Sequence, residues 1–271
     1  MRAMSRRAAG LWILAAAMVA ALGAWRAGAR ATSVDPYFLT GWILLALVAA
    51  LALYGIRRRL PMLPLGRASI WLSAHVVLGV AATGTYAIHV GTAWPAGAAD
   101  RALALLFIMV VASGIVGHAL QAILPARLAR SGPELIYERI PAEIARLREA
   151  AEAALLEAAG AAGHETLAGY YAQTLAWYFE RPRFALSHVF GGHGAEAWEK
   201  RCLGAVDKLL SPEERPQLAT LVELCRRKRA VDAQYALQSL LRAWTFVHAP
   251  AATAFVVMAA WHTLIVHVYA G

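Results

Sequence analysis

The feature that most constrains the fold is a set of long apolar stretches that carry almost no charge. A helix needs roughly 20 apolar residues to cross a bilayer, and five stretches qualify or nearly do. The last four contain no Asp, Glu, Lys or Arg. We therefore predict an all-α integral membrane bundle of five spans. The stretches are Ala8–Trp25, Phe38–Ile56, Ile70–Ala93, Ala102–Leu124 and Trp244–Tyr269.

The composition supports a membrane protein and argues against three other classes. Hydrophobic residues make up 60% of the 271 residues and charged residues 16%, whereas a soluble domain has about 45–50% and about 25%. A soluble enzyme, a disordered chain and a nucleic-acid-binding domain are all disfavoured. The net charge is +9, but positive and negative residues nearly balance within residues 125–243. Most of the excess positive charge therefore lies near the short loops, where it indicates membrane orientation.

The basic residues of the short segments predict the topology. Arginines cluster before the first span, and Arg57, Arg58, Arg59 and Arg67 lie between the second and third. The positive-inside rule then places the N-terminus in the cytoplasm and the C-terminus outside, in a bacterial inner membrane. The first stretch also resembles a signal peptide with a cleavage motif at Ala29–Ala31. We expect a retained anchor, and cleavage would leave four spans.

A helical cytoplasmic insertion is expected between the fourth and fifth spans. The predicted organisation is spans one to four in 1–124, the insertion in 125–243 and the fifth span in 244–271. Helix-start signals occur at Pro141 and at Ser211, where Ser211 is the expected N-cap, Pro212 the first helical residue and Glu214 the capping-box partner. The second of these helices is expected to continue into the fifth span. A further helix is expected over His164–Glu180, and a loop over Gly191–Gly194.

Histidines are the main ionisable groups inside the apolar stretches, and ionisable residues in a membrane suggest function. His75 and His89 are 14 residues apart in the third span, and His248 and His262 are 14 apart in the fifth. Fourteen helical steps return to within about 40° of the starting direction, so each pair shares one helix face. The members of a pair are separated by about 21 Å along the axis.

The two histidine pairs match in depth as well as in spacing. The third and fifth spans run in the same direction, so His75 and His248 lie near the cytoplasmic side and His89 and His262 nearer the outside. Two stacked histidine pairs predict two b-type haems, each with its iron bound by two histidines. Neutral imidazole binds iron well, and iron with no open coordination position suits electron transfer. The alternative is that these histidines only form hydrogen bonds between helices.

His-x13-His on two parallel membrane helices resembles the di-haem core of cytochrome b and the membrane domain of ferric reductases and NADPH oxidases. The resemblance extends over the last four spans and implies that His75, His89, His248 and His262 are the axial iron ligands. We expect no flavin and nicotinamide module after the last span, so direct NADPH oxidation is not expected. The long helical insertion is foreign to both families.

Other histidines and the cysteines receive weaker interpretations. His118 on the fourth span is predicted to bind the cofactor, either as an inner ligand or through a haem propionate or quinone oxygen. His267 is about 140° around the helix from His262 and is expected to face the outer interface. In the insertion, His188, His193, Cys202 and Cys225 match no zinc pattern, and CxxCH for covalent haem is absent. We expect the two cysteines to be reduced thiols.

The sequence therefore predicts a di-haem b-type cytochrome that carries electrons across the bilayer. With no substrate pocket apparent, we expect an electron-transfer subunit of a larger oxidoreductase rather than a complete enzyme. The expected exchange partners are a membrane quinone and a periplasmic redox protein such as a c-type cytochrome. The alternative is a haem-free membrane anchor that docks a cytoplasmic partner through the insertion.

Overall fold

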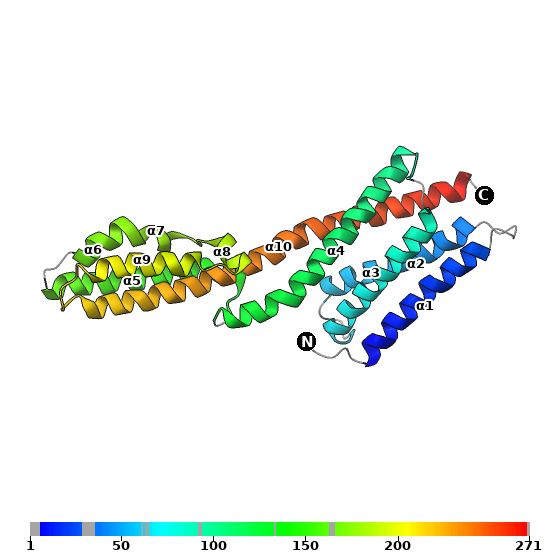
Figure 1. Ribbon diagram of the computed structural model, residues 1–271. Coiled ribbons are helices and arrows are strands. Elements are labelled where there is room, and N and C mark those ends of the chain that lie inside the picture. The colour runs from blue at the N-terminus through cyan, green and yellow to red at the C-terminus, as the bar shows by residue number, and fades with distance from the viewer. Residues whose placement is uncertain are drawn as a thin grey trace. The chain divides into compact units, whose positions relative to one another are not determined.

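The computed structural model is all-α, with 88% of the chain in helices. It describes residues 6–28, 36–60, 62, 65–91, 94–132, 134–162 and 166–269, and this part contains no strand. Figure 1 shows the helices in chain order. The expected cleavage motif at Ala29–Ala31 and the expected helix start at His164 lie outside the described residues. The predicted fold class is confirmed.

Five helices are long and apolar enough to cross a membrane, so the chain is a multi-pass membrane protein. Each predicted span lies inside one of these helices, apart from the last few residues of the third. The fourth and fifth spans belong to helices that extend well past the apolar stretch. The five helices are α1 (Arg6–Gly28), α2 (Pro36–Arg59), α3 (Ala68–Val90), α4 (Ala98–Arg130) and α10 (Arg215–Tyr269).

The chain divides into two compact units. Unit 1 comprises Met1–His118 and Phe246–Gly271, and unit 2 comprises Ala119–Thr245. Helices α4 and α10 each lie partly in unit 1 and partly in unit 2. We describe the two units separately.

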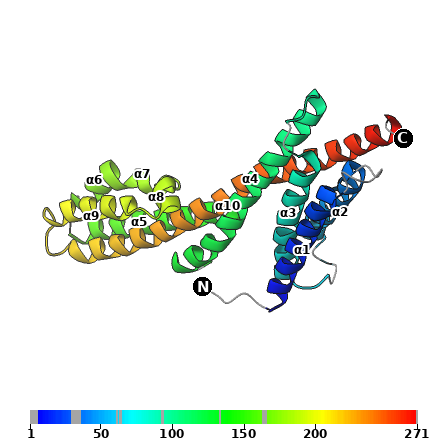
Figure 2. The ribbon, with the colours of Figure 1, turned by 45° about the vertical axis from the view of Figure 1, so that its right-hand side comes forward.

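Small residues bring the membrane helices of unit 1 close together. Ala81 and Ala82 of α3 are buried against Leu47 of α2, and α1, α2 and α3 lie side by side in both ribbon views (Figures 1 and 2). A Cβ at Gly84 would approach Val19 Cγ1 of α1 to 2.8 Å, so α1 and α3 need a glycine here. Small residues at helix contacts are the usual means of packing in a bilayer, because they let backbones approach.

Unit 2 is a helical bundle around one apolar core. Its central residues include Ile144, Leu175, Val206 and Leu221, which come from four different segments and are almost fully buried. The shorter helices of this unit are the 3₁₀ turn Tyr137–Arg139, α5 (Ile140–Ala162), α6 (Thr166–Tyr170), a π-helical turn (Tyr171–Leu175), α7 (Ala176–Glu180), α8 (Ala185–Phe190) and α9 (Gly194–Asp207).

The expected first helical residue, Pro212, is wrong by three residues. Residues 212–214 form a turn, and α10 begins at Arg215. The Glu214 carboxylate does accept a hydrogen bond from the Ser211 amide at 3.3 Å, as a capping box requires. Its other oxygen accepts from the Leu167 amide at 3.1 Å. Because the buried Glu214 side chain joins α10 to α6, this tertiary contact holds the residues before α10 in a turn.

The first part of α10 carries a buried ion pair in the core of unit 2. Lys228 Nζ lies 2.6 Å from Asp232 Oδ1, and both side chains are fully buried. The ammonium also donates to the Arg181 carbonyl oxygen at 3.1 Å and lies over the Tyr178 ring at 4.6 Å. Burying a charge is costly unless it is paired and hydrogen-bonded. These contacts therefore fix how α10 packs against the residues around α7.

Candidate functional site

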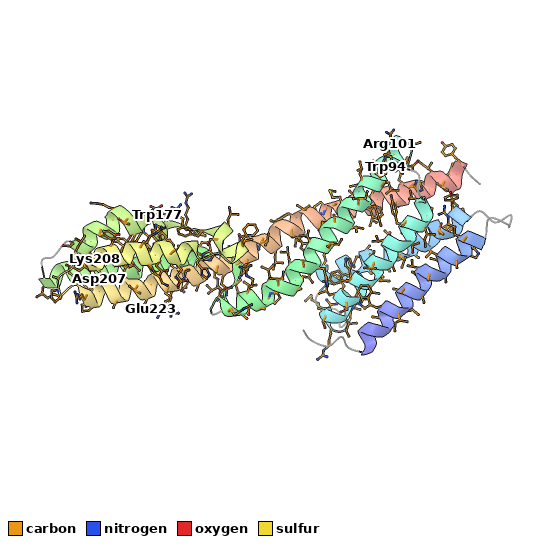
Figure 3. The ribbon with its side chains drawn as sticks, in the orientation of Figure 1. Trp94, Arg101, Trp177, Asp207, Lys208 and Glu223 are labelled. Carbon is orange, nitrogen blue, oxygen red and sulfur yellow. The ribbon has the colours of Figure 1, made fainter. Side chains whose placement is uncertain are left out.

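The outer histidines of the two pairs line one cavity of about 600 Å³ in unit 1. His89 comes from α3 and His262 from α10, and both side chains are partly buried. The remaining lining is mostly apolar and aromatic; it includes Trp94 near the beginning of α4, labelled in Figure 3. A volume of this size lies within the range of cofactor-binding pockets. The cavity therefore brings together two histidines that lie 173 residues apart in the sequence.

Both outer histidines have a side-chain partner at Nδ1. His89 Nδ1 lies 3.0 Å from Thr40 Oγ1 of α2. His262 Nδ1 lies 3.1 Å from Asp100 Oδ1 of α4. A carboxylate only accepts hydrogen bonds, so an Nδ1–H on His262 would face an acceptor.

The partner of the inner His248 follows the same pattern. Ser113 Oγ of α4 lies 2.8 Å from His248 Nδ1. Ser113 donates its single hydroxyl proton to the Val110 carbonyl oxygen at 3.0 Å, and Thr40 likewise donates its proton to the Tyr37 carbonyl oxygen at 3.1 Å. A hydroxyl that donates its one proton to a carbonyl oxygen can only accept from the imidazole, so this arrangement fits a ring protonated at Nδ1.

Three of the four paired histidines therefore have an oxygen atom 2.8 to 3.1 Å from Nδ1. With the proton on Nδ1, Nε2 carries the lone pair, and the contact also orients the ring. Metal-binding histidines show this arrangement, in which the second nitrogen donates to a carboxylate, a carbonyl or another polar group. Nε2 of His89, His248 and His262 would then be the nitrogen available to bind a metal ion.

The glycine after each hydroxyl residue lies against the same imidazole. A Cβ at Gly41 would come within 3.2 Å of His89 Cε1, and a Cβ at Gly114 would come within 3.8 Å of His248 Cε1. Thr40-Gly41 and Ser113-Gly114 thus present the same two features to one histidine of each pair. The hydroxyl contacts the ring nitrogen, and at Gly41 the absent side chain also leaves room for the ring.

His75, the fourth paired histidine, lies close enough to His248 for their charges to interact. Its ring centroid is 4.8 Å from that of Tyr54 on α2. Its Nδ1 is buried and makes no hydrogen bond within the part of the chain that the structure describes. The inner histidines therefore lie near each other, one on α3 and the other on α10.

An aromatic cluster includes Phe255, which lies midway between His248 and His262 in the sequence of α10. Phe255 is seven residues from both His248 and His262. Its ring lies 5.5 Å from that of Phe107, which stacks on Tyr86 at 3.9 Å. These side chains join α3, α4 and α10 into one packed layer with Val48 of α2.

The structure places the other membrane histidines at exposed positions. His118 on α4 has an exposed side chain, and its expected role in cofactor binding stays a prediction. His267 is exposed but also lines the outer cavity, where its ring stacks on Phe38 with centroids 5.4 Å apart. His267 is thus a third imidazole at the outer cavity.

In the insertion, His188, His193, Cys202 and Cys225 do not form a shared site. Cys202 and Cys225 are free thiols, and Cys225 is buried in the core. No group of three or more His, Cys, Asp or Glu side chains suited to a metal ion occurs within the described ranges. A bis-histidine haem uses two protein ligands, so this observation does not bear on the paired histidines.

Comparisons with known proteins gave no relative. No family model, curated protein or solved structure matches the chain.

Proposed function

We propose that the chain is a di-haem b-type membrane cytochrome that carries electrons across the bilayer as a subunit of a larger oxidoreductase. The observation that carries this proposal is the oxygen contact shared by Nδ1 of His89, His248 and His262. Histidines that only join helices can use either nitrogen, whereas these three contacts all leave Nε2 of the ring for metal binding.

The residues present fit a haem at the outer level, and at the inner level two imidazoles lie close together. The outer cavity offers about 600 Å³ between His89 and His262, and Gly41 leaves space beside the first ring. At the inner level, His75 and His248 are near each other, and Gly114 lies beside the His248 ring. Haem held by two imidazoles supplies one-electron iron chemistry without an open coordination position.

The chain's own side chains would orient the ligands and exclude water. Thr40, Ser113 and Asp100 hold the imidazole rings in one orientation. Tyr86, Phe107 and Phe255 fill the layer between the two levels with packed apolar surface, so water has little room there. The two levels together would span most of the apolar thickness, because 14 helical residues rise about 21 Å.

The proposed orientation and partners follow from the sequence. The positive-inside rule places the inner pair, His75 and His248, on the cytoplasmic side of a bacterial inner membrane, together with the insertion. Electrons would pass between a membrane quinone and a periplasmic redox protein of the c-type cytochrome class, as the resemblance to cytochrome b implies.

The decisive experiment is a reduced-minus-oxidised absorption spectrum of the purified full chain together with pyridine haemochrome analysis. We expect a low-spin b-type spectrum and two haems per chain. One haem per chain would contradict the two-level assignment. No haem in protein purified from haem-replete cells would favour the haem-free anchor instead.

A further inference from the structure

A second cavity, of about 300 Å³, lies within unit 2 and is lined mainly by polar groups. Its walls come from three segments of the chain. Arg130 and Ser131 stand at the end of α4, the loop between α8 and α9 forms a second wall, and Arg226 and Arg229 of α10 form the third. The haem proposal does not use this cavity.

The charged groups that line the cavity are mostly positive. Three arginines face one carboxylate, Glu196, and that carboxylate is already paired with Lys200 at 2.7 Å. Arg229 donates to Glu199 at 2.7 Å through Nη1 alone. Arg226 donates to both oxygens of Glu223, which projects from α10 in Figure 3. A guanidinium has five N–H donors, so these bonds leave each arginine with further donors.

His188 also belongs to the lining of the cavity. Its Nε2 is buried and has no hydrogen-bond partner among the described residues. Arg127 donates to its carbonyl oxygen, which fixes the backbone at this point. The pKa of His188 is lowered to about 4, first because the ring is removed from water and then because Arg229, Lys228 and Arg127 repel a proton. The potential around this ring is therefore positive.

The first turn of α9 also opens onto the cavity. The helix is 14 residues long and has no side-chain cap at its N-terminus. Ala195 and Glu196 of this turn line the cavity, and Gly194 donates its amide to Ser187 Oγ at 3.1 Å. The amides at a helix start point out of the helix and favour a negative charge.

We propose that this cavity binds a phosphoryl group. A phosphoryl group presents several oxygens in different directions, which matches donors that converge from α4, α9 and α10, and Arg suits such recognition. The phosphoryl group belongs either to a soluble phosphate or phosphate ester, or to the head group of an anionic lipid. Both sources use the same contacts, and the experiment separates them.

The test measures binding of inorganic phosphate to the full chain in detergent by calorimetry, with chloride at equal ionic strength as the reference. We expect saturable binding with a dissociation constant of about 1 mM or lower. Arg130→Gln and Arg226→Gln should each weaken binding about tenfold, the effect of losing one charge-assisted bond. Equal melting temperatures for the variants and the parent establish that they fold.

Arg227→Gln is the matched control. Arg227 is the next residue in the same basic run and bonds the same Glu223, at 2.9 Å, but it does not line the cavity. Its replacement should leave the affinity for phosphate unchanged. An equal loss in Arg226→Gln and Arg227→Gln would overturn the proposal in favour of a general charge effect. Failure of phosphate to bind the parent chain saturably would overturn it as well.

Nanodiscs then identify the source of the phosphoryl group. If a lipid head group occupies the cavity, phosphate binding should be lost in phosphatidylglycerol discs and kept in phosphatidylcholine discs, and Arg226→Gln should remove this difference. If phosphate binds equally in both discs, the ligand is soluble.

Discussion

Asp100 and His262 form a carboxylate–imidazole contact of 3.1 Å between Oδ1 and Nδ1. The corresponding contact of His248 is to the hydroxyl of Ser113 at 2.8 Å. The outer level of histidines therefore includes an acidic partner, whereas the inner histidine of the same helix has a neutral one. A negatively charged partner makes an imidazole a stronger electron donor to a metal ion.

This difference predicts different redox potentials at the two levels. Asp100→Asn should raise the midpoint potential of the outer haem by tens of millivolts, because a neutral amide stabilises oxidised iron less than a carboxylate does. The inner haem should keep its potential. Spectroelectrochemical titration measures both values. Asp207→Asn, at the exposed end of α9 (Figure 3), is the control and should change neither. Equal shifts at both haems would contradict the assignment.

Single histidine replacements should remove one haem at a time. His89→Ala or His262→Ala should cause loss of the outer haem and keep the inner one, and His75→Ala or His248→Ala should do the reverse. Haem content and low-temperature spectra measure the outcome. His267→Ala is the control within the outer cavity and should keep both haems. Loss of the outer haem in that variant would instead identify His267 as an axial ligand.

The glycine beside His89 provides a test of packing. Gly41→Ala places a Cβ about 3.2 Å from His89 Cε1, a distance that forces the ring to move. We expect a shifted or partly lost outer-haem spectrum in this variant. Gly79→Ala on α3 is the matched control, because a Cβ there meets no atom within 4 Å. An identical spectrum in the two variants would show that the His89 ring tolerates the added methyl.

Acid should destabilise the insertion through His188. The pKa of this ring is about 4 in the folded protein, below the usual 6.5 of an unfolded chain. The unfolded chain binds the proton more readily, so stability is fully present above pH 6.5 and falls as the pH decreases towards 4. We expect a loss of about 1 kcal/mol after allowing for solvent screening of this partly exposed ring. Urea unfolding of the full chain between pH 7 and pH 5 measures it, and His188→Gln should reduce the pH dependence.

The proposed orientation predicts which side of the membrane the insertion occupies. Lys208 lies next to Asp207 at the end of α9, and both are exposed (Figure 3). A cysteine introduced as Lys208→Cys, in a chain without Cys202, should resist a membrane-impermeant thiol reagent in intact cells and react in opened cells. Labelling of intact cells from the periplasm would reverse the topology.

The sequence was sufficient for the spans, because a span depends only on the length of one apolar stretch, whereas the histidine ligands stay a prediction. The second helix, for example, runs from Pro36 to Arg59 where the apolar stretch runs from Phe38 to Ile56. The start of α10 was missed because Glu214 bonds a distant amide as well as its own turn. No local pattern reports such a tertiary contact.

Sequence reasoning also missed the partners of the histidines. Hydroxyl residues in membrane helices usually bond a carbonyl of their own helix, as Thr85 and Thr253 do at 2.9 Å. Nothing in the local sequence of Thr40 or Ser113 shows that a histidine from another helix lies beside it. A signal was present in the pairs Thr40-Gly41 and Ser113-Gly114, but Thr83-Gly84 has the same form and Thr83 bonds its own helix, to the Gly79 carbonyl oxygen. The dipeptide alone therefore does not identify a ligand partner.

The core of unit 2 draws on α10 as well as on helices that precede it, and this affects how the protein is made. Leu218, Leu221 and Leu224 belong to that core, yet α10 leaves the ribosome after all the other helices. The earlier helices cannot bury their apolar faces until these leucines emerge. The last span follows within a few tens of residues, so completion of the core of unit 2 and insertion of the last span fall close together during translation. Slow insertion of the last span would therefore delay completion of the core, and slow completion of the core would delay insertion. Chaperones would have to protect the exposed apolar faces during such a delay.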